Sequence, residues 1–310
     1  MQTFRTTFEI KRLADNQIDY KSKLLLVGSC FADNIGSRLT SLRFSTVLNP
    51  HGILYNPLSI EKCFDDIVKN RKYGHDDLIY FNEKWLSLNH HGCFSDSSAE
   101  LCLQNINSSV DNAHKHLEEC SHIIVTLGTS IVYFNKDNNN CVGNCHKIPA
   151  SSFFSRRISL EETVSSLSNL ISSVRNVNRN VHFIFTVSPI RHWKDGAVEN
   201  MRSKSTLILG ISEVCDMFEN VSYFPSYEIM MDDLRDYRFY ADDMLHPSEQ
   251  AVDYIWNAFS ETYIDNSCCE KMKLIDKLNK AKAHRFERGA SMQEMEKFNK
   301  YIASLEEKIQ

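Results

Sequence analysis

The chain has 310 residues, of which 42% are hydrophobic and 24% charged, and its formal net charge is −5. This length suits one large α/β domain or two smaller ones. The acidic balance argues against nucleic acid as a partner, and the lack of an apolar run of about 18 residues argues against a membrane span.

The N-terminal stretch MQTFRTTFEIKR lacks the apolar segment of a signal peptide. Without a secretion signal, the ten scattered cysteines are expected to be reduced thiols in a cytoplasmic protein. The grouping of Cys141, Cys145 and His146 offers three ligands at most, whereas a structural zinc site takes four. We therefore predict no metal and no cofactor.

In chain order, the first predicted element is a buried strand at 23–28 (KLLLVG), because this segment is short, apolar and ended by glycine. Apolar residues then recur at helical spacing from Phe31. Asn56-Pro57 predicts a second helix start, since Asn can cap a helix and Pro is favoured at its first position. Aromatic and β-branched residues at 78–89 predict a hairpin.

The second half continues the alternation of strands and helices. Buried strands are predicted at 122–128 and 181–189, and a fourth strand with its exit loop is predicted at 221–230. A turn of Asp and Asn predicts a hairpin at 131–143, and Ser159 with Glu162 resembles a capping box. A further helix is predicted to open at His246-Pro247.

This alternation predicts a central parallel sheet with helices on both faces, a three-layer α/β/α sandwich with β-hairpin insertions. Ligands bind such sheets at the carboxyl ends of the strands, here Gly28, Gly128 and Ser188. The side chains that follow these ends are therefore candidates for one site: Ser29, Cys30, Thr129, Ser130, Arg191 and His192.

Beyond about residue 266 the composition shifts to Lys, Glu and Gln, and two amphipathic helices are predicted at 268–286 and 291–309. We interpret residues 1–265 as one domain and 266–310 as a helical extension. The extension is expected to pack on the domain or on a partner subunit, which leaves a homodimer open.

Ser29 and Cys30 lie side by side where a strand turns into a helix. A helix N-terminus favours negative charge, and its free N–H groups can stabilise an oxyanion. Cysteine gains most there, because its pKa falls and the thiolate is the nucleophile. The alternative is that Ser29 only caps the helix and Cys30 is buried, and the residues alone leave both interpretations open.

Asp243 and His246 form a second candidate group, separated by two residues. A histidine there can act as general base while a carboxylate orients its ring. The alternative is a surface aspartate beside a capping histidine. Asp242 is the less favoured orienting residue.

The motif Gly28-Ser29-Cys30-Phe31-Ala32 resembles the one for which the GSCFA-domain proteins are named. Further stretches are similar to the same family: NPLSI at 56–60, VTLGTS at 125–130, NCHKIPA at 144–150, TVSPIRHWKDG at 186–196 and MLHPS at 244–248. This resemblance spans roughly residues 5–262. It implies kinship with the SGNH, or GDSL-like, hydrolases, hence a flavodoxin-like α/β/α fold and acyl chemistry without a defined substrate.

The SGNH pattern places its nucleophilic serine at the third position of the first block, which is Cys30 here. A slip of one residue would make Ser29 the nucleophile instead. The last block of the pattern, Asp-x-x-His, is matched by Asp243 and His246.

The resemblance also implies an oxyanion hole formed by the amides of Cys30 and Gly52. The third block, Gly128-Thr129-Ser130, lacks the asparagine of the pattern, which weakens the oxyanion hole or moves it elsewhere. We keep Gly128 and Ser130 as candidates for it.

Candidate substrate-binding residues are Asn56, Thr129, His146, Arg191 and His192. The planar guanidinium of Arg191 suits a carboxylate or phosphate, although a solvated loop is an equal alternative. His146 lies either in the site or on its rim. Phe81, Trp85 and Trp193 form either an apolar wall or local packing.

These residues predict a hydrolase that cleaves an ester or other acyl group through a covalent acyl-enzyme. The expected substrate is a small-molecule or glycan-linked acyl compound. Two alternatives stay open: an acyltransferase acting on a glycan precursor, and a non-catalytic binding module on a degenerate hydrolase fold.

Overall fold

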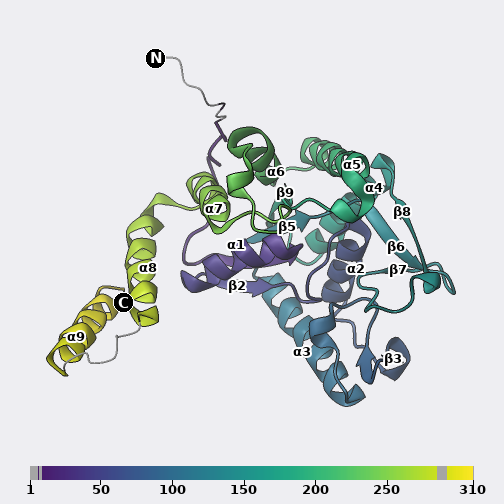
Figure 1. The fold of residues 1–310 in the computed structure, drawn as a ribbon, viewed down its shortest axis with the longest axis horizontal. Helices are drawn as coiled ribbons and strands as arrows, with labels where there is room; N and C mark the ends of the chain where they lie inside the picture. Colours follow the sequence, from purple (N-terminus) through teal and green to yellow (C-terminus); the bar gives the residue numbers. More distant parts are fainter. Residues whose placement is uncertain (1–5, 7–8, 285–291, 310) are drawn as a thin grey trace.

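The computed structural model describes residue 6, residues 9–284 and residues 292–309. Its centre is a parallel sheet of five strands in the order β10-β9-β5-β1-β2 (Figure 1). The strands are β1 (Lys23–Gly28), β2 (Ser45–Leu48), β5 (His122–Leu127), β9 (His182–Val187) and β10 (Val221–Phe224). In the shared register Gly28 lies opposite Thr126, and Thr126 opposite Thr186, so the carboxyl ends of three strands lie side by side.

Helices cover both faces of this sheet, which confirms the predicted α/β/α sandwich. Alternate residues of β1 face opposite cores: Leu24 and Leu26 pack in one apolar cluster, Leu25 and Val27 in the other. The first cluster includes α1 (Cys30–Ser41) and α7 (Glu249–Tyr263). The second includes α2 (Pro57–Val68), α3 (Ala99–Glu118), α4 (Leu160–Arg175) and α5 (Gly196–Met217).

Local capping explains two of the helix starts. The side chain of Asn56 accepts the amide of Ser59, and Pro57 is the first residue of α2. Ser159 and Glu162 form a reciprocal capping box at the start of α4. Both starts were predicted from sequence.

The start of α7 corrects the prediction of a helix at His246-Pro247. The side chain of Ser248 caps α7 by accepting the amide of Ala251, and the helix begins at Glu249. Pro247 instead pairs with Tyr240 in an isolated β-bridge. His246 therefore lies in the loop before α7.

Two antiparallel sheets are inserted between these elements. One is the predicted hairpin of β3 (Ile79–Phe81) and β4 (Lys84–Leu86). The other has three strands in the order β7-β6-β8: β6 (Ile131–Asn135), β7 (Cys141–Val142) and β8 (Phe153–Arg157). Strands β2 and β8 were not predicted, because β2 has four residues and four of the five residues of β8 are exposed.

After β10 come a helical turn α6 (Ser226–Glu228) and a π-helical segment, Ile229–Leu234. The chain ends in α8 (Cys269–Ala283) and α9 (Met292–Ile309), which extend from one end of the molecule in Figure 1. Ile275 and Leu278 of α8 share an apolar cluster with α1. The predicted ends of these helices at 286 and 291 fall outside the described residues.

All ten cysteines are free thiols. Within the described part of the chain, no group of three or more His, Cys, Asp or Glu side chains is arranged to hold a metal ion. No helix among those described is both long and apolar enough to cross a membrane.

Candidate active site

A cavity of about 890 Å³ opens at the carboxyl edge of the parallel sheet. Its walls come from the segments that follow β1, β5 and β9, from the β6–β8 insertion and from the loop before α7. The structure thus brings seven of the candidate residues to one cavity: Ser29, Cys30, Asn56, Thr129, Arg191, His192 and His246.

The tight turn between β1 and α1 positions Cys30. Gly28 has a φ of +150°, and a Cβ there would lie 2.2 Å from the carbonyl oxygen of Thr126. Ser29 is 1% exposed and its hydroxyl accepts the amide of Phe31 as the helix cap. Cys30 begins α1 and is partly exposed at the cavity. The two neighbours therefore differ: the Ser29 hydroxyl is engaged in capping, whereas the thiol of Cys30 carries no such role.

Opposing effects act on the Cys30 thiol. Burial raises its pKa above the ordinary value, which corrects the fall expected at a helix N-terminus, and the charge of Asp33 adds to the rise. The amide of Cys30 and the ammonium of Lys204 act in the other direction, because both favour the thiolate. No acceptor for the Cys30 amide occurs among the described residues, as expected at a first helical position.

Lys204 on α5 is a functional candidate that sequence reasoning missed. It is 1% exposed, and its Nζ donates to the carbonyl oxygen of Ser188 at 2.7 Å. Burial lowers its pKa to about 7, while the nearby Cys30 acts to raise it. The sequence held a signal: Lys204 precedes Leu207 and Ile211 at helical spacing, so a lysine stands on the apolar face of α5.

His246 and Asp243 are paired at the mouth of the cavity. Asp243 Oδ2 accepts from His246 Nδ1 at 2.5 Å, and Asp243 Oδ1 accepts the amides of Leu245 and His246 at 2.9 Å each. These hydrogen bonds lower the pKa of Asp243 to about 2, so it is a carboxylate at neutral pH. With Nδ1 bound to the carboxylate, Nε2 is the nitrogen left for proton transfer.

The other candidate oxyanion donors are already engaged. The amide of Gly52 donates to Asn49 O at 2.7 Å, and the amide of Gly128 to Tyr55 O at 2.7 Å. The amide of Ser130 donates to the hydroxyl of Ser203 at 2.7 Å. None of these three candidates is among the described residues that line the cavity. Cys30 is the one candidate whose amide stays available.

The polar candidates on the walls are also held by neighbours. The side-chain amide of Asn56 donates to the hydroxyl of Ser59, and the hydroxyl of Thr129 bonds that of Ser203. His192 packs edge-on against Tyr55, and burial lowers its pKa to about 4, so its ring is neutral at pH 7. These residues shape the cavity more than they offer free polar groups.

His146 lies behind the cavity wall. Its Nε2 contacts the carbonyl oxygen of Ser87 at 2.8 Å, whereas the preceding Asn144 and Cys145 line the cavity. Of the three aromatic candidates, Trp193 lines the cavity; Phe81 and Trp85 belong to the β3–β4 hairpin.

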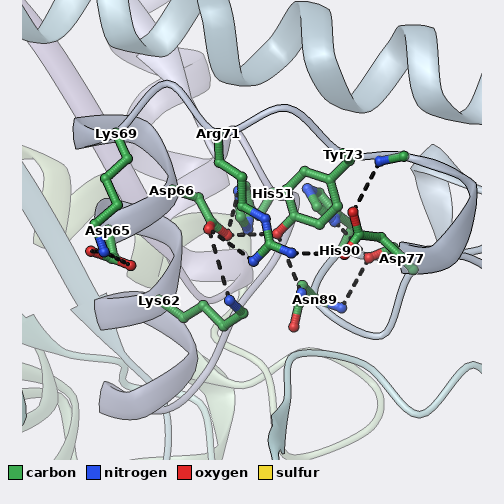
Figure 2. Close-up of polar contacts among 12 residues, drawn as sticks. His51, Lys62, Asp65, Asp66, Lys69, Arg71, Tyr73, Asp77, Asn89 and His90 are labelled. Atoms are coloured by element: carbon green, nitrogen blue, oxygen red, sulfur yellow. Dashed lines mark hydrogen bonds and ion pairs between the residues drawn. The ribbon is translucent and has the colours of Figure 1, made fainter.

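A buried polar cluster lies next to His146 in the fold. Figure 2 shows Asp66 between Lys62, Arg71 and Tyr73, and the Tyr73 hydroxyl donates to Asp66 at 2.6 Å. His51, 1% exposed, has its Nε2 3.8 Å from Asp66. These residues were not predicted as a cluster, because charged residues at this spacing are also typical of an exposed helix face.

Comparisons with known proteins place this architecture in context. A family 3 carbohydrate esterase from Clostridium thermocellum aligns with a TM-score of 0.37 and 11% identity, covering 83% of this chain and 98% of that one. An acetyl xylan esterase from Butyrivibrio proteoclasticus aligns with a TM-score of 0.39 and 14% identity, covering 85% and 65%. No curated protein matches the chain. The GSCFA family model matches residues 23–259, most of the chain, and the protein therefore belongs to the GSCFA family.

Proposed function

We propose that this protein is an acyl-ester hydrolase that forms a covalent acyl-enzyme on Cys30. The observation that carries the proposal is that Cys30 and the Asp243–His246 pair, more than 200 residues apart in sequence, line or adjoin one cavity. A nucleophile, a base and an orienting carboxylate are the parts that acyl transfer needs. The resemblance of the two motifs to the SGNH pattern supports the same chemistry.

In the proposed mechanism the Cys30 thiol gives its proton to Nε2 of His246, and Sγ attacks the ester carbonyl. Asp243 stabilises the imidazolium, and the amide of Cys30 donates to the oxyanion. The tetrahedral intermediate collapses as the carbon–oxygen bond to the alcohol breaks and His246 returns the proton to the leaving oxygen. His246 then takes a proton from water, whose oxygen attacks the thioester and releases the acid and the thiol.

Lys204 supplies a positive charge behind the nucleophile. Its ammonium favours the thiolate over the thiol, which offsets part of the effect of burial on Cys30. We assign Lys204 a positioning role, because it is buried and does not line the cavity.

A labelling experiment tests the nucleophile. The protein is treated at pH 7 with limiting iodoacetamide and, separately, with a fluorophosphonate, and the adducts are mapped by mass spectrometry. We expect Cys30 to be alkylated in preference to the other nine cysteines, and His246→Ala to slow this reaction. Labelling at Ser29 would restore the serine mechanism. No labelling at either residue would favour the binding-module interpretation.

The two neighbouring aspartates offer a matched control for the orienting residue. Asp243→Asn loses the carboxylate on His246 Nδ1, and we expect kcat on an accepted ester to fall by about 10²–10⁴-fold. In the described structure His246 Nδ1 is bonded to Asp243 and not to Asp242. The variant Asp242→Asn should therefore keep the parent rate. Equal rates for both variants and the parent would contradict the proposed triad.

A further inference from the structure

The charges on the cavity wall are unbalanced. Of the described residues that line the cavity, Arg191 and Lys194 are cations and Asp195 is the one carboxylate. Outside this lining, Lys204 is a buried amine behind Ser188, and Asp243 is a carboxylate bound to His246 at the mouth of the cavity. An excess of positive groups in a cleft attracts an anionic ligand.

Arg191 is the cation on this wall with a buried N–H that lacks an acceptor within the described part of the chain. Among the described residues no Asp or Glu oxygen lies within 4 Å of it, a feature that it shares with some other arginines, whereas six pair with carboxylates: Arg38, Arg71, Arg156, Arg157, Arg202 and Arg238. Its Nε is buried and has no hydrogen-bond partner in the described structure. A buried N–H without an acceptor is costly, so an acceptor from a ligand would be stabilising there.

The other neighbours of Arg191 are aromatic, and one of them, Tyr240, makes a side-chain hydrogen bond with it. Its guanidinium carbon lies 5.1 Å from the ring centre of Trp193, which lines the cavity and is 48% exposed. Lys194 Nζ donates to the hydroxyl of Tyr133 at 2.7 Å and lies 5.0 Å from its ring centre. Aromatic rings hold both cations at the wall without neutralising their charge.

We infer that the cavity binds an ester that carries an anionic group, either a carboxylate or a phosphate, on its acyl or alcohol part. This anionic group pairs with the guanidinium of Arg191. The fork of five N–H donors on arginine matches two oxygens of either group. The inference deepens the proposed function and rests on it for the point of attack, Cys30.

Two alkylating reagents of nearly equal size test the charge preference at Cys30. Iodoacetate carries a carboxylate where iodoacetamide carries a neutral amide. The two reagents also differ in intrinsic reactivity, so each rate at Cys30 is divided by the rate of the same reagent with glutathione. We expect Cys30 to react with iodoacetate about tenfold faster than the corrected iodoacetamide rate. Arg191→Met should abolish this preference, measured as the ratio of the two corrected rates in the same variant, and Arg191→Lys should keep part of it.

Arg202→Met is the matched control, because Arg202 is exposed on α5 and pairs with Glu199. It should leave the preference for iodoacetate unchanged. A corrected ratio near one in the parent protein would overturn the inference while leaving Cys30 as the nucleophile.

A binding measurement separates this inference from the proposed function. Trp193 fluorescence is titrated with malonate, with inorganic phosphate and with neutral malonamide, and Trp193→Phe identifies the signal. We expect saturable quenching by malonate, by phosphate or by both, and none by malonamide. This quenching should be absent in Arg191→Met. The anion that binds more tightly shows whether the substrate carries a carboxylate or a phosphate. If the anions quench the fluorescence but Cys30 does not react in the labelling experiment, the proposed hydrolase function is refuted and the anion site is supported. No quenching by either anion would refute the anion site.

Discussion

Lys204 sets the reactivity of Cys30 in the mechanism proposed above. Its side chain is 1% exposed, and burial lowers its pKa to about 7, so its positive charge is present below that pH and is lost above it. Lys204→Met keeps the apolar stem and removes the charge. We expect Cys30 alkylation to slow by about tenfold below pH 7, where Lys204 carries its charge, so that the pH profile of the reaction changes there.

The same variant carries its own structural check. Lys204→Met would leave the carbonyl of Ser188 without its donor but would also remove a buried charge, so the melting temperature should change little. Lys115→Met, at a side chain that is 71% exposed, is the control. An unshifted pH profile in Lys204→Met with the fold intact would show that Lys204 has no part in activating Cys30.

The β1–α1 turn is the element on which the cavity depends. A Cβ at Gly28 would lie 2.2 Å from the carbonyl oxygen of Thr126 in β5, and this contact is with backbone that cannot move aside. We expect Gly28→Ala to lower the free energy of unfolding by about 3 kcal/mol or more, as measured by urea denaturation. Gly74→Ala is the matched control, because nothing lies within 4 Å of a Cβ there, and it should change stability by less than about 1 kcal/mol.

Elements with a strong pattern were predictable from sequence, and weakly patterned ones were not. Strands β1, β5 and β9 are continuous apolar runs, because both of their faces are buried between helices. The half-buried edge strand β2 and the exposed β8 lack such a run. The start of α7 was misplaced because Pro247 is also suited to the extended pairing that it makes with Tyr240.

At the scale of the whole molecule, the rule that ligands bind at the carboxyl edge of a parallel sheet brought Cys30, Arg191 and His192 into one predicted site, whereas His246 came from the Asp-x-x-His motif. What the sequence could not show was which groups were already engaged. The amide of Gly52 is bound to Asn49, and this depends on the path of a loop rather than on a pattern. The burial of Lys204 likewise depends on how α5 packs against the sheet.

Buried neutral histidines make the whole fold sensitive to acid. Burial lowers the pKa of His51 to about 3 and of His182 to about 4, and it holds that of His90 well below its ordinary value of 6.5. Below pH 6.5 the unfolded chain therefore binds protons that the folded chain does not. Stability should be complete above that pH and fall as pH drops toward 4, by up to about 1.4 kcal/mol per pH unit for each such histidine.

Three carboxyls oppose this trend. Burial raises the pKa of Asp33, Asp66 and Glu228, so the folded chain takes up protons there before the unfolded chain does. Their effect is greatest near the ordinary carboxyl range, about pH 4, so the histidine effect is best isolated between pH 6.5 and 5.

Urea denaturation at a series of pH values within that window measures the slope of the unfolding free energy against pH. Replacing a buried histidine, His51→Asn, should reduce the slope of the unfolding free energy against pH even if it lowers stability at every pH. The slope depends on the difference in bound protons between the unfolded and folded chains, and not on the contacts that the side chain makes. His75→Asn, at a side chain that is 59% exposed, is the control for the substitution itself. A flat profile in the parent protein from pH 6.5 to 5 would mean that the folded chain protonates these histidines, and that the buried cluster of Figure 2 opens to water in solution.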